Sequence, residues 1–389
     1  MSIHGKAYIA GAYEHPTRKA VDKSLAQLHA EVAKGALDDA GISHTDVDGY
    51  FCAGDAPGLG PINMVDYMGL KPNYIDSTDT GGSSYVVHVE HAAQAIAEGR
   101  CKIALITLAG RPASEGMATG TAPRVYNQNA PDVAFEFPFS PVVTNMYAMA
   151  AMRHMHEYGT TSEQLAWIRV AASTHAQHNE HAMRREVVTV EDVVNSPMIT
   201  TPLHRLDCCV ISDGGGALVV VHPDIAKQLK RPLVKIRGVA SYVKGQDNGD
   251  TDLTYTAGRV SGPRAFEEAK VKPSDIKYAS IYDSFTITVL LQLEDLGFCE
   301  KGKGGQFVSD GNLISGVGKL PFNTDGGGLC NNHPANRGGM TKVIEAVRQL
   351  RGEAHEKVQV PNCDIALAHG TGGSIGTRHC SSTLIMERE

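Results

Sequence analysis

The residues best suited to move a proton or attack a carbonyl stand beside glycine-rich segments of this sequence. His333 follows Cys330 in one such segment, and an imidazole with an ordinary pKa of about 6.5 can accept a proton at neutral pH. A histidine needed only for packing has little reason to stand in an exposed turn, so we expect His333 to be exposed and functional. Cys330 is the one cysteine near this segment and leaves a thiol nucleophile as an alternative.

Histidines are also concentrated between residues 154 and 181. None belongs to a His-Glu-x-x-His motif, and their spacing does not put two on one helical face beside a carboxylate. We therefore expect no metal site and place these side chains on solvated helix faces. The five are His154, His156, His175, His178 and His181.

Composition narrows the possible classes of protein. The 389 residues are 42% hydrophobic, which is enough for a large core, and the formal charge of −7 argues against binding to nucleic acid or to an anionic membrane. Eight cysteines without a Cys-x-x-Cys pair are typical of reduced thiols, no apolar run could span a bilayer, and the first residues lack an apolar signal core. These features predict a cytoplasmic protein.

The elements that position these residues alternate between helices and strands. In each half of the chain, paired glycines precede a predicted helix, and an apolar strand follows it. This pattern predicts two α/β halves packed face to face, although a generic βαβ unit could repeat by chance. The predicted helices cover 19–39, 86–98 and 341–350, the strands cover 102–109 and 363–369, and glycine turns cover 80–84 and 370–376.

The segment between the halves lacks this alternation of helices and strands. Residues 110–201 include the aromatic stretch Phe135–Phe139 and the histidine-rich helices. An insertion of this size is a candidate lid over a site built by the two halves.

Several stretches resemble the sterol-carrier-protein-X type of thiolase. They are residues 158–166, 181–185 and 201–217, Tyr282-Asp-Ser-Phe-Thr286, Asn332-His-Pro334 and His369-Gly-Thr-Gly-Gly373. The resemblance covers nearly the whole chain in order and implies an α/β thiolase fold, with duplicated βαβαβαββ halves in a five-layered α/β/α/β/α core. It implies an N-terminal half of residues 1–110 and 202–228, an inserted loop domain of residues 111–201 and a C-terminal half of residues 229–389. Members of this family bind coenzyme A thioesters and form dimers or tetramers.

The site residues implied by the resemblance depart from a thiolase. The place of the nucleophilic Cys is taken by Gly82, or by Ser83 if the alignment slips by one residue, and Gly370 replaces the second Cys. Tyr282 opens the third thiolase motif, which reads Tyr282-Asp-Ser-Phe285 here. The fourth thiolase motif, Gly-His-Pro, survives in part as His333 followed by Pro334. A thiolase would need both missing thiols to pass an acyl group through the enzyme.

These departures favour retro-aldol cleavage of a β-hydroxyacyl-CoA, which needs an acid/base pair and an oxyanion hole but no nucleophile. Tyr282 and His333 are the predicted pair. Asp283 is a further catalytic candidate, for which orienting the loop or accepting a backbone hydrogen bond is favoured over proton transfer, and His369 either reaches the site or closes its strand. The predicted substrate- and oxyanion-binding residues are Gly82, Ser83, Gly370, Gly372 and Cys330.

The resemblance to thiolase-like steroid side-chain aldolases also implies coenzyme A as part of the substrate, with no other cofactor. It implies a homodimer and a separate small partner with an OB fold and a zinc ribbon. In those aldolases a second Tyr stands near the place of His333. This sequence has no Tyr there and therefore differs from those aldolases at the residue that would pair with Tyr282. Two alternatives stay open: an acyltransferase or Claisen enzyme that uses Ser83 or Cys330, and a non-catalytic subunit that binds acyl-CoA or lipid.

Overall fold

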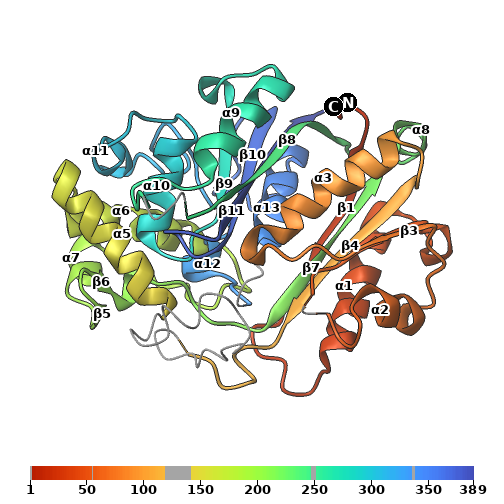
Figure 1. Ribbon diagram of the computed structural model, residues 1–389, viewed down its shortest axis with the longest axis horizontal. Helices are drawn as coiled ribbons and strands as arrows, with labels where there is room; N and C mark the ends of the chain where they lie inside the picture. The colour runs from red at the N-terminus through yellow and green to blue at the C-terminus, as the bar shows by residue number, and fades with distance from the viewer. Residues whose placement is uncertain (1, 55, 119–141, 247–250, 335–337) are drawn as a thin grey trace.

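One nine-stranded sheet runs through the computed structural model, in the order β3-β2-β4-β7-β1-β8-β11-β10-β9 (Figure 1). The structure describes residues 2–54, 56–118, 142–246, 251–334 and 338–389. The first half contains β1 (Tyr8–Glu14), α1 (Leu25–Ala40), β2 (Gly49–Phe51), α2 (Pro61–Met68), β3 (Tyr74–Asp76), α3 (Ser84–Ala97), β4 (Ile103–Gly110), β7 (Gly214–Val221) and α8 (Pro223–Ala226). The second half contains β8 (Val234–Lys244), α9 (Gly258–Ala269), β9 (Tyr278–Ile281), α10 (Thr286–Asp295), α11 (Gly304–Val308), α12 (Gly327–Cys330), α13 (Gly338–Arg351), β10 (Ile365–Gly373) and β11 (His379–Arg388).

The two halves of the sheet have the same connectivity. In the first half β2 is parallel to β4, and β7 is antiparallel to both β4 and β1. In the second half β9 is parallel to β10, and β11 is antiparallel to both β10 and β8. The halves join where Tyr8 and Ile9 pair with Lys235 and Val234. The predicted duplication is therefore confirmed in the fold.

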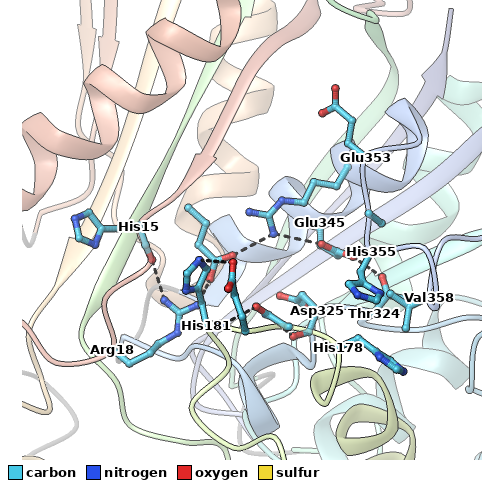
Figure 2. A pocket seen from close by; sticks show the side chains of 15 residues that line it. His15, Arg18, His178, His181, Thr324, Asp325, Glu345, Glu353, His355 and Val358 are labelled. Atoms are coloured by element: carbon cyan, nitrogen blue, oxygen red, sulfur yellow. Dashed lines mark hydrogen bonds and ion pairs between the residues drawn. The ribbon is translucent and has the colours of Figure 1, made fainter.

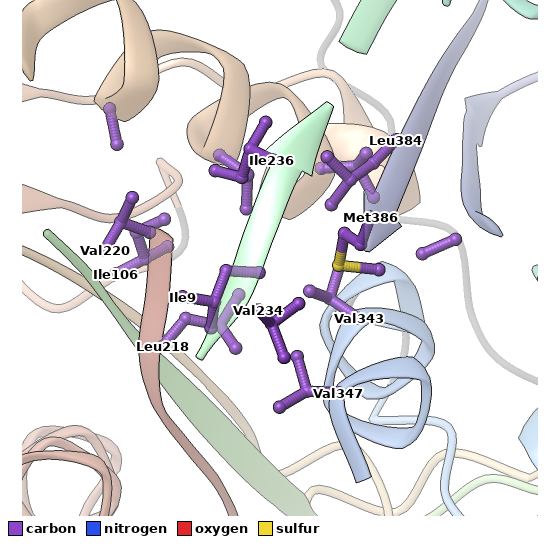
Figure 3. Close-up of a cluster of buried hydrophobic side chains, with 14 of the residues drawn as sticks. Ile9, Ile106, Leu218, Val220, Val234, Ile236, Val343, Val347, Leu384 and Met386 are labelled. Atoms are coloured by element: carbon purple, nitrogen blue, oxygen red, sulfur yellow. The ribbon is translucent and has the colours of Figure 1, made fainter. Parts of the chain in front are cut away.

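Two helices, α3 and α13, form the layer between the halves. Apolar side chains of both helices share one buried cluster with strands from each half. On α13, Val343 and Val347 are one helical turn apart and therefore point to the same side. Figure 3 shows them with Ile9, Ile106, Leu218 and Val220 from the first half and Val234, Ile236, Leu384 and Met386 from the second.

Each half of the sheet also carries helices on the face that points away from α3 and α13. The order helix, first half of the sheet, α3 and α13, second half of the sheet, helix gives five layers. Helix α1 covers the first half, and helices α9 and α10 cover the second. Helix α1 was predicted over residues 19–39 but begins at Leu25, because the Ser24 hydroxyl accepts a hydrogen bond from the Gln27 N–H and caps it. It ends at Gly41, whose φ of 69° is the left-handed conformation that glycine adopts at low cost.

The segment between the halves folds as helices and a small hairpin. It contains α5 (Val143–Tyr158), α6 (Ser162–Ala176), α7 (Val190–Val194), β5 (Met198–Thr200) and β6 (Leu203–His204). Side chains of α5 and α6 share a buried cluster with α10 of the second half. The aromatic stretch of residues 135–139 lies outside the described residues, and the predicted domain boundaries stay a prediction.

Candidate active site

Tyr282 stands immediately after β9, at the end of its parallel ladder with β10. Its N–H donates to the His369 carbonyl oxygen (2.9 Å). Its ring lies against Gly82 and Gly338, at the starts of the two central helices: a Cβ atom on Gly82 would come 2.6 Å from Tyr282 Cε2, and one on Gly338 would come 2.7 Å from it. The phenol ring therefore occupies the space that a side chain at position 82 would need.

His333 is in direct contact with this tyrosine. Tyr282 Oη and His333 Nε2 are 2.9 Å apart, and the two rings meet edge to face. The prediction that His333 is exposed was wrong: only 7% of it is accessible, because its backbone is hydrogen-bonded to the buried Ser212 and its ring contacts Tyr282. Burial lowers the pKa of His333 to about 4, so the ring is neutral at pH 7 and can accept a proton.

Asp283 holds the turn that carries His333. Its carboxylate accepts hydrogen bonds from the N–H groups of Gly328 (2.8 Å) and Leu329 (3.1 Å), which belong to α12. Lys342 Nζ of α13 lies 2.9 Å from Asp283 Oδ1, and both side chains are buried. These contacts fit the interpretation that Asp283 orients the loop. Lys342 was not among the residues predicted near this loop, although its ion pair with Asp283 places it there.

The two glycine segments implied in oxyanion binding lie in direct contact. Residues 81–83 form a 3₁₀ turn before α3, whereas Gly370–Gly373 continue β10 as a strand and not as the predicted turn. A Cβ atom on Gly372 would overlap the Thr80 carbonyl oxygen and come 2.7 Å from Gly82 N, and one on Gly370 would come 3.1 Å from Ser83 Cα. The backbones of these segments thus approach more closely than side chains would allow.

The thiols and the hydroxyl that could replace the missing nucleophile are buried. Burial raises the pKa of Cys330 to about 11, and Cys330 packs in the apolar cluster that includes Ala172 and Ala176 of α6. Burial also raises the pKa of Cys380, which lies near the Thr80–Ser83 turn and was not predicted as a site residue. The Ser83 hydroxyl donates to the Thr80 carbonyl oxygen (2.9 Å). We therefore expect these groups to be protonated at neutral pH.

His369 points to the opposite face of β10 from Gly370. Its Nδ1 lies 2.8 Å from Thr383 Oγ1 on β11, and its ring faces Gly258 at the start of α9. Burial lowers its pKa to about 3. The structure thus joins His369 to Tyr282 through the backbone and does not bring the imidazole to the Tyr282 hydroxyl.

A charged cavity of about 220 Å³ is shown in Figure 2. Its walls come from the end of β1, the inserted segment and the residues around α13, and they include Glu14, Arg18, Asp325, Glu345 and Arg348. Arg348 Nη1 pairs with Glu14 (3.2 Å) and with Glu345 (3.4 Å). The lining is mostly ion-paired, and neither Tyr282 nor His333 belongs to it.

The prediction that the five histidines of residues 154–181 lie on solvated helix faces was only partly correct. His154 and His175 are buried, contrary to the expectation of solvated faces: His154 Nε2 pairs with Glu294 (3.1 Å), and His175 Nε2 accepts from the Ser315 N–H (2.9 Å). Within the described ranges, no group of three or more His, Cys, Asp or Glu side chains could hold a metal ion. Among all the residues that the structure describes, no helix has the length and apolar character needed to cross a membrane.

The comparisons with known proteins agree with this architecture. The family described as "Thiolase C-terminal domain-like" matches residues 241–388. An acetyl-CoA acetyltransferase of Methanothermobacter thermautotrophicus is 33% identical over 92% of this chain and 93% of its own length. A steroid side-chain-cleaving aldolase of Thermomonospora curvata is 36% identical over 95% and 96% of the two chains.

A lyase is also among the relatives. The 17-hydroxy-3-oxo-4-pregnene-20-carboxyl-CoA lyase of Mycobacterium tuberculosis is 34% identical over 90% of this chain and 92% of its own. The solved structure described as the "Ltp2-ChsH2(DUF35) aldolase" superposes with a TM-score of 0.88 at 33% identity and covers 99% and 98% of the two chains.

These relatives confirm the predicted resemblance to steroid side-chain aldolases and the predicted class of enzyme, a carbon–carbon lyase acting on a CoA thioester. The duplicated sheet and the layer formed by α3 and α13 match what a thiolase fold requires. With relatives above 30% identity along almost its entire length, the chain belongs to the thiolase family.

Proposed function

We propose that this enzyme cleaves a β-hydroxyacyl-CoA by a retro-aldol reaction, with Tyr282 and His333 as its acid/base pair. The observation that carries the proposal is the exchange at position 82. We take Gly82 to stand where a thiolase carries its nucleophile; the ring of Tyr282 lies against it, and Tyr282 Oη is 2.9 Å from His333 Nε2. A site arranged in this way has proton-transfer groups where an acyl-accepting thiol would stand.

The proposed reaction balances without a covalent intermediate. The Tyr282–His333 pair removes the proton of the β-hydroxyl, and the C–O bond of the substrate becomes a carbonyl as the bond between Cα and Cβ breaks. The electron pair moves onto the thioester as an enolate, which we assign to the backbone N–H group of Gly82. Gly372, the other predicted donor, lies within the β10–β11 ladder opposite Cys380. The same pair then returns the proton to Cα, and the products are a ketone or aldehyde and a shorter acyl-CoA.

A steroid side chain is the proposed acyl group. The relatives named as an aldolase and as a lyase act on such compounds by their names, and the CoA ester named for the lyase carries a hydroxyl on the carbon β to its thioester carbonyl. This makes it the first probe to try.

The test follows carbonyl release from 17-hydroxy-3-oxo-4-pregnene-20-carboxyl-CoA and from simpler β-hydroxyacyl-CoA esters. We expect turnover to fall by about 100- to 10,000-fold in Tyr282→Phe, with little change in KM. Turnover should also survive alkylation of the cysteines. Wild-type turnover in Tyr282→Phe, or CoA-ester binding without cleavage of any of these probes, would overturn the proposal.

An acyltransferase is the second candidate, because one relative of similar identity is named an acetyl-CoA acetyltransferase. It requires Ser83, Cys330 or Cys380 as the acyl acceptor, although all three are buried. Incubation with acetyl-CoA would then leave an acyl adduct visible by mass spectrometry. Loss of that adduct in one of the single variants Ser83→Ala, Cys330→Ala or Cys380→Ala would identify the acceptor.

A small partner protein is part of the proposal. The similar solved structure is named as a complex with a DUF35 protein. We propose that a separate chain with an OB fold and a zinc ribbon assembles with this enzyme. Co-purification with that chain, and a comparison of turnover with and without it, test the assembly.

A homodimer is also proposed, through the edge of the sheet. Strand β3 is the outermost strand of the first half, and large apolar side chains are exposed on it and around α2. We expect Ile62→Lys/Ile75→Lys to halve the mass measured by light scattering, and Val317→Lys, an exposed apolar site outside this surface, to leave it unchanged. The exposed residues are Leu59, Ile62, Tyr67 and Ile75.

A further inference from the structure

We propose that Asn332, Ser212 and Glu14 form a buried hydrogen-bonded chain that sets the position of His333 against Tyr282. They are positioning residues, since none of them touches the reacting atoms. The inference rests on the proposed function of the Tyr282–His333 pair. It adds to that function Glu14 and Ser212 from the first half of the molecule and Asn332 from the second.

The chain begins at the backbone of the histidine. The His333 N–H donates to Ser212 Oγ (2.9 Å), and the Ser212 hydroxyl donates to Asn332 Oδ1 (2.7 Å). Ser212 and Asn332 are fully buried. Ser212 uses its oxygen as acceptor and its hydrogen as donor, so the direction of the chain is defined.

The chain ends on a fixed carboxylate. Asn332 Nδ2 donates to Glu14 Oε1 (3.0 Å) at the end of β1. Glu14 is in turn paired with Arg18 (2.8 Å) and Arg348 (3.2 Å). These cations hold the pKa of Glu14 at about 2, despite its burial, so it stays ionised and anchors the Asn332 amide.

The geometry makes His333 depend on this anchor. Glu14 belongs to the first half, whereas His333 and Tyr282 belong to the second. Nδ1 of the His333 ring has no hydrogen-bond partner among the described residues, so the ring is oriented by Tyr282 and by its own backbone. A shift of a fraction of an ångström in that backbone would lengthen the contact with Tyr282, and errors of this size at a catalytic group cost up to about 100-fold in rate.

Asn332 is also where the sequence departs from the Gly-His-Pro motif of thiolases. The carboxamide is the part of the side chain that bridges Glu14 and Ser212, and a glycine would supply neither bond. An aspartate would place a second carboxylate against Glu14. Asn332→Ala and Asn332→Asp therefore remove the bridge in two different ways, one by deletion and one by repulsion.

The experiment is a double-mutant cycle on the full-length enzyme with a hydroxyacyl-CoA that it cleaves. We expect Asn332→Ala and Ser212→Ala each to lower kcat by about 10- to 100-fold, with KM within about twofold of wild type. In a His333→Gln background the same substitutions should cause no further loss, because they act through His333. A loss that is fully additive in that background would overturn the inference.

A second readout does not depend on turnover. In protein labelled with ¹⁵N-histidine, the ring signals of His333, assigned by their absence in His333→Gln, should shift in Asn332→Ala while those of the remote His379 stay in place. Unchanged His333 signals would contradict the proposed chain, even if no substrate is cleaved. Loss of activity in Asn332→Ala but not in His333→Gln or Tyr282→Phe would instead count against the proposed function.

Discussion

Position 82 and the ring of Tyr282 compete for the same space, so a side chain larger than glycine at position 82 does not fit beside this ring. A Cβ atom on Gly82 would overlap the Thr371 carbonyl oxygen and come 2.6 Å from Tyr282 Cε2. We expect Gly82→Ala to lower the free energy of unfolding by about 1–3 kcal/mol through overpacking, and to lower turnover because Tyr282 moves. Urea unfolding and the hydroxyacyl-CoA assay measure the two effects.

The matched control is Gly245→Ala, because a Cβ atom there meets nothing within 4 Å. It should leave both quantities unchanged. Adding Tyr282→Ala to Gly82→Ala should recover only part of the stability, since the Thr371 carbonyl oxygen stays in place. Equal stability of Gly82→Ala and wild type would show that the ring does not fill this position.

For individual residues, the sequence predicts the Tyr282–His333 pair but not the residues that surround it. Tyr282 and His333 were predicted together from two motifs 51 residues apart, and their side chains meet. Ser212 and Glu14 were missed because they reach the His333 loop across more than 100 residues of sequence, and such contacts leave no local pattern. The signal that could have found Asn332 is its replacement of glycine in the Gly-His-Pro motif.

Among the elements, the short helix α12 and the long helix α13 are held together by one buried ion pair. The Asp283 carboxylate accepts hydrogen bonds from two N–H groups of α12 and forms an ion pair with Lys342 of α13. We expect Asp283→Ala to destabilise the protein by about 3–5 kcal/mol, because the buried Lys342 then loses its ion-pair partner and keeps only the more distant charges of Asp325 and Glu14. Replacing both partners, in Asp283→Ala/Lys342→Met, should recover much of this loss, as measured by urea unfolding. A double variant as unstable as the sum of the two single variants would rule out the pairing.

The elements themselves were well predicted where apolar runs are continuous. The strand predicted over 102–109 is found at Ile103–Gly110, and the helix predicted over 341–350 at Gly338–Arg351. The glycines of residues 370–373 suggested a turn, yet they continue β10 because its ladder with β11 runs through Gly373. Glycine marks close backbone approach here, against residues 80–83, and composition alone cannot distinguish that from a turn.

For the whole molecule, buried histidines couple folding to pH. Burial lowers the pKa to about 4 for His88, His175 and His333, and to about 3 for His369 and His379. An unfolded chain protonates these rings near pH 6.5, so stability is fully present above that pH and is lost as the pH falls toward 4. Each ring contributes up to about 1.4 kcal/mol per pH unit in that window.

Carboxyl groups whose pKa is raised by burial act in the opposite direction, and they include Glu90, Asp207, Asp295 and Asp325. Burial and the charge of Asp325 raise the pKa of Glu345 to about 7, so its contribution stabilises the fold as the pH falls and offsets about one of the five histidines. We expect the urea midpoint to fall steeply between pH 6.5 and pH 5, and His379→Asn to make that fall shallower by about one proton. A midpoint that stays flat or rises over this range would contradict the buried, neutral state of these rings.

The same coupling determines what the activity profile can reveal about His333. A domain with a stability of about 5–15 kcal/mol that loses several kcal/mol per pH unit unfolds before the pH reaches 4, where the His333 ring would gain its proton. We therefore expect kcat/KM to show no break near pH 6.5, and then to collapse together with the near-UV circular dichroism. A break near pH 6.5 in protein that is still folded would mean that an ordinary, solvent-exposed imidazole carries the proton, and not the buried ring beside Tyr282.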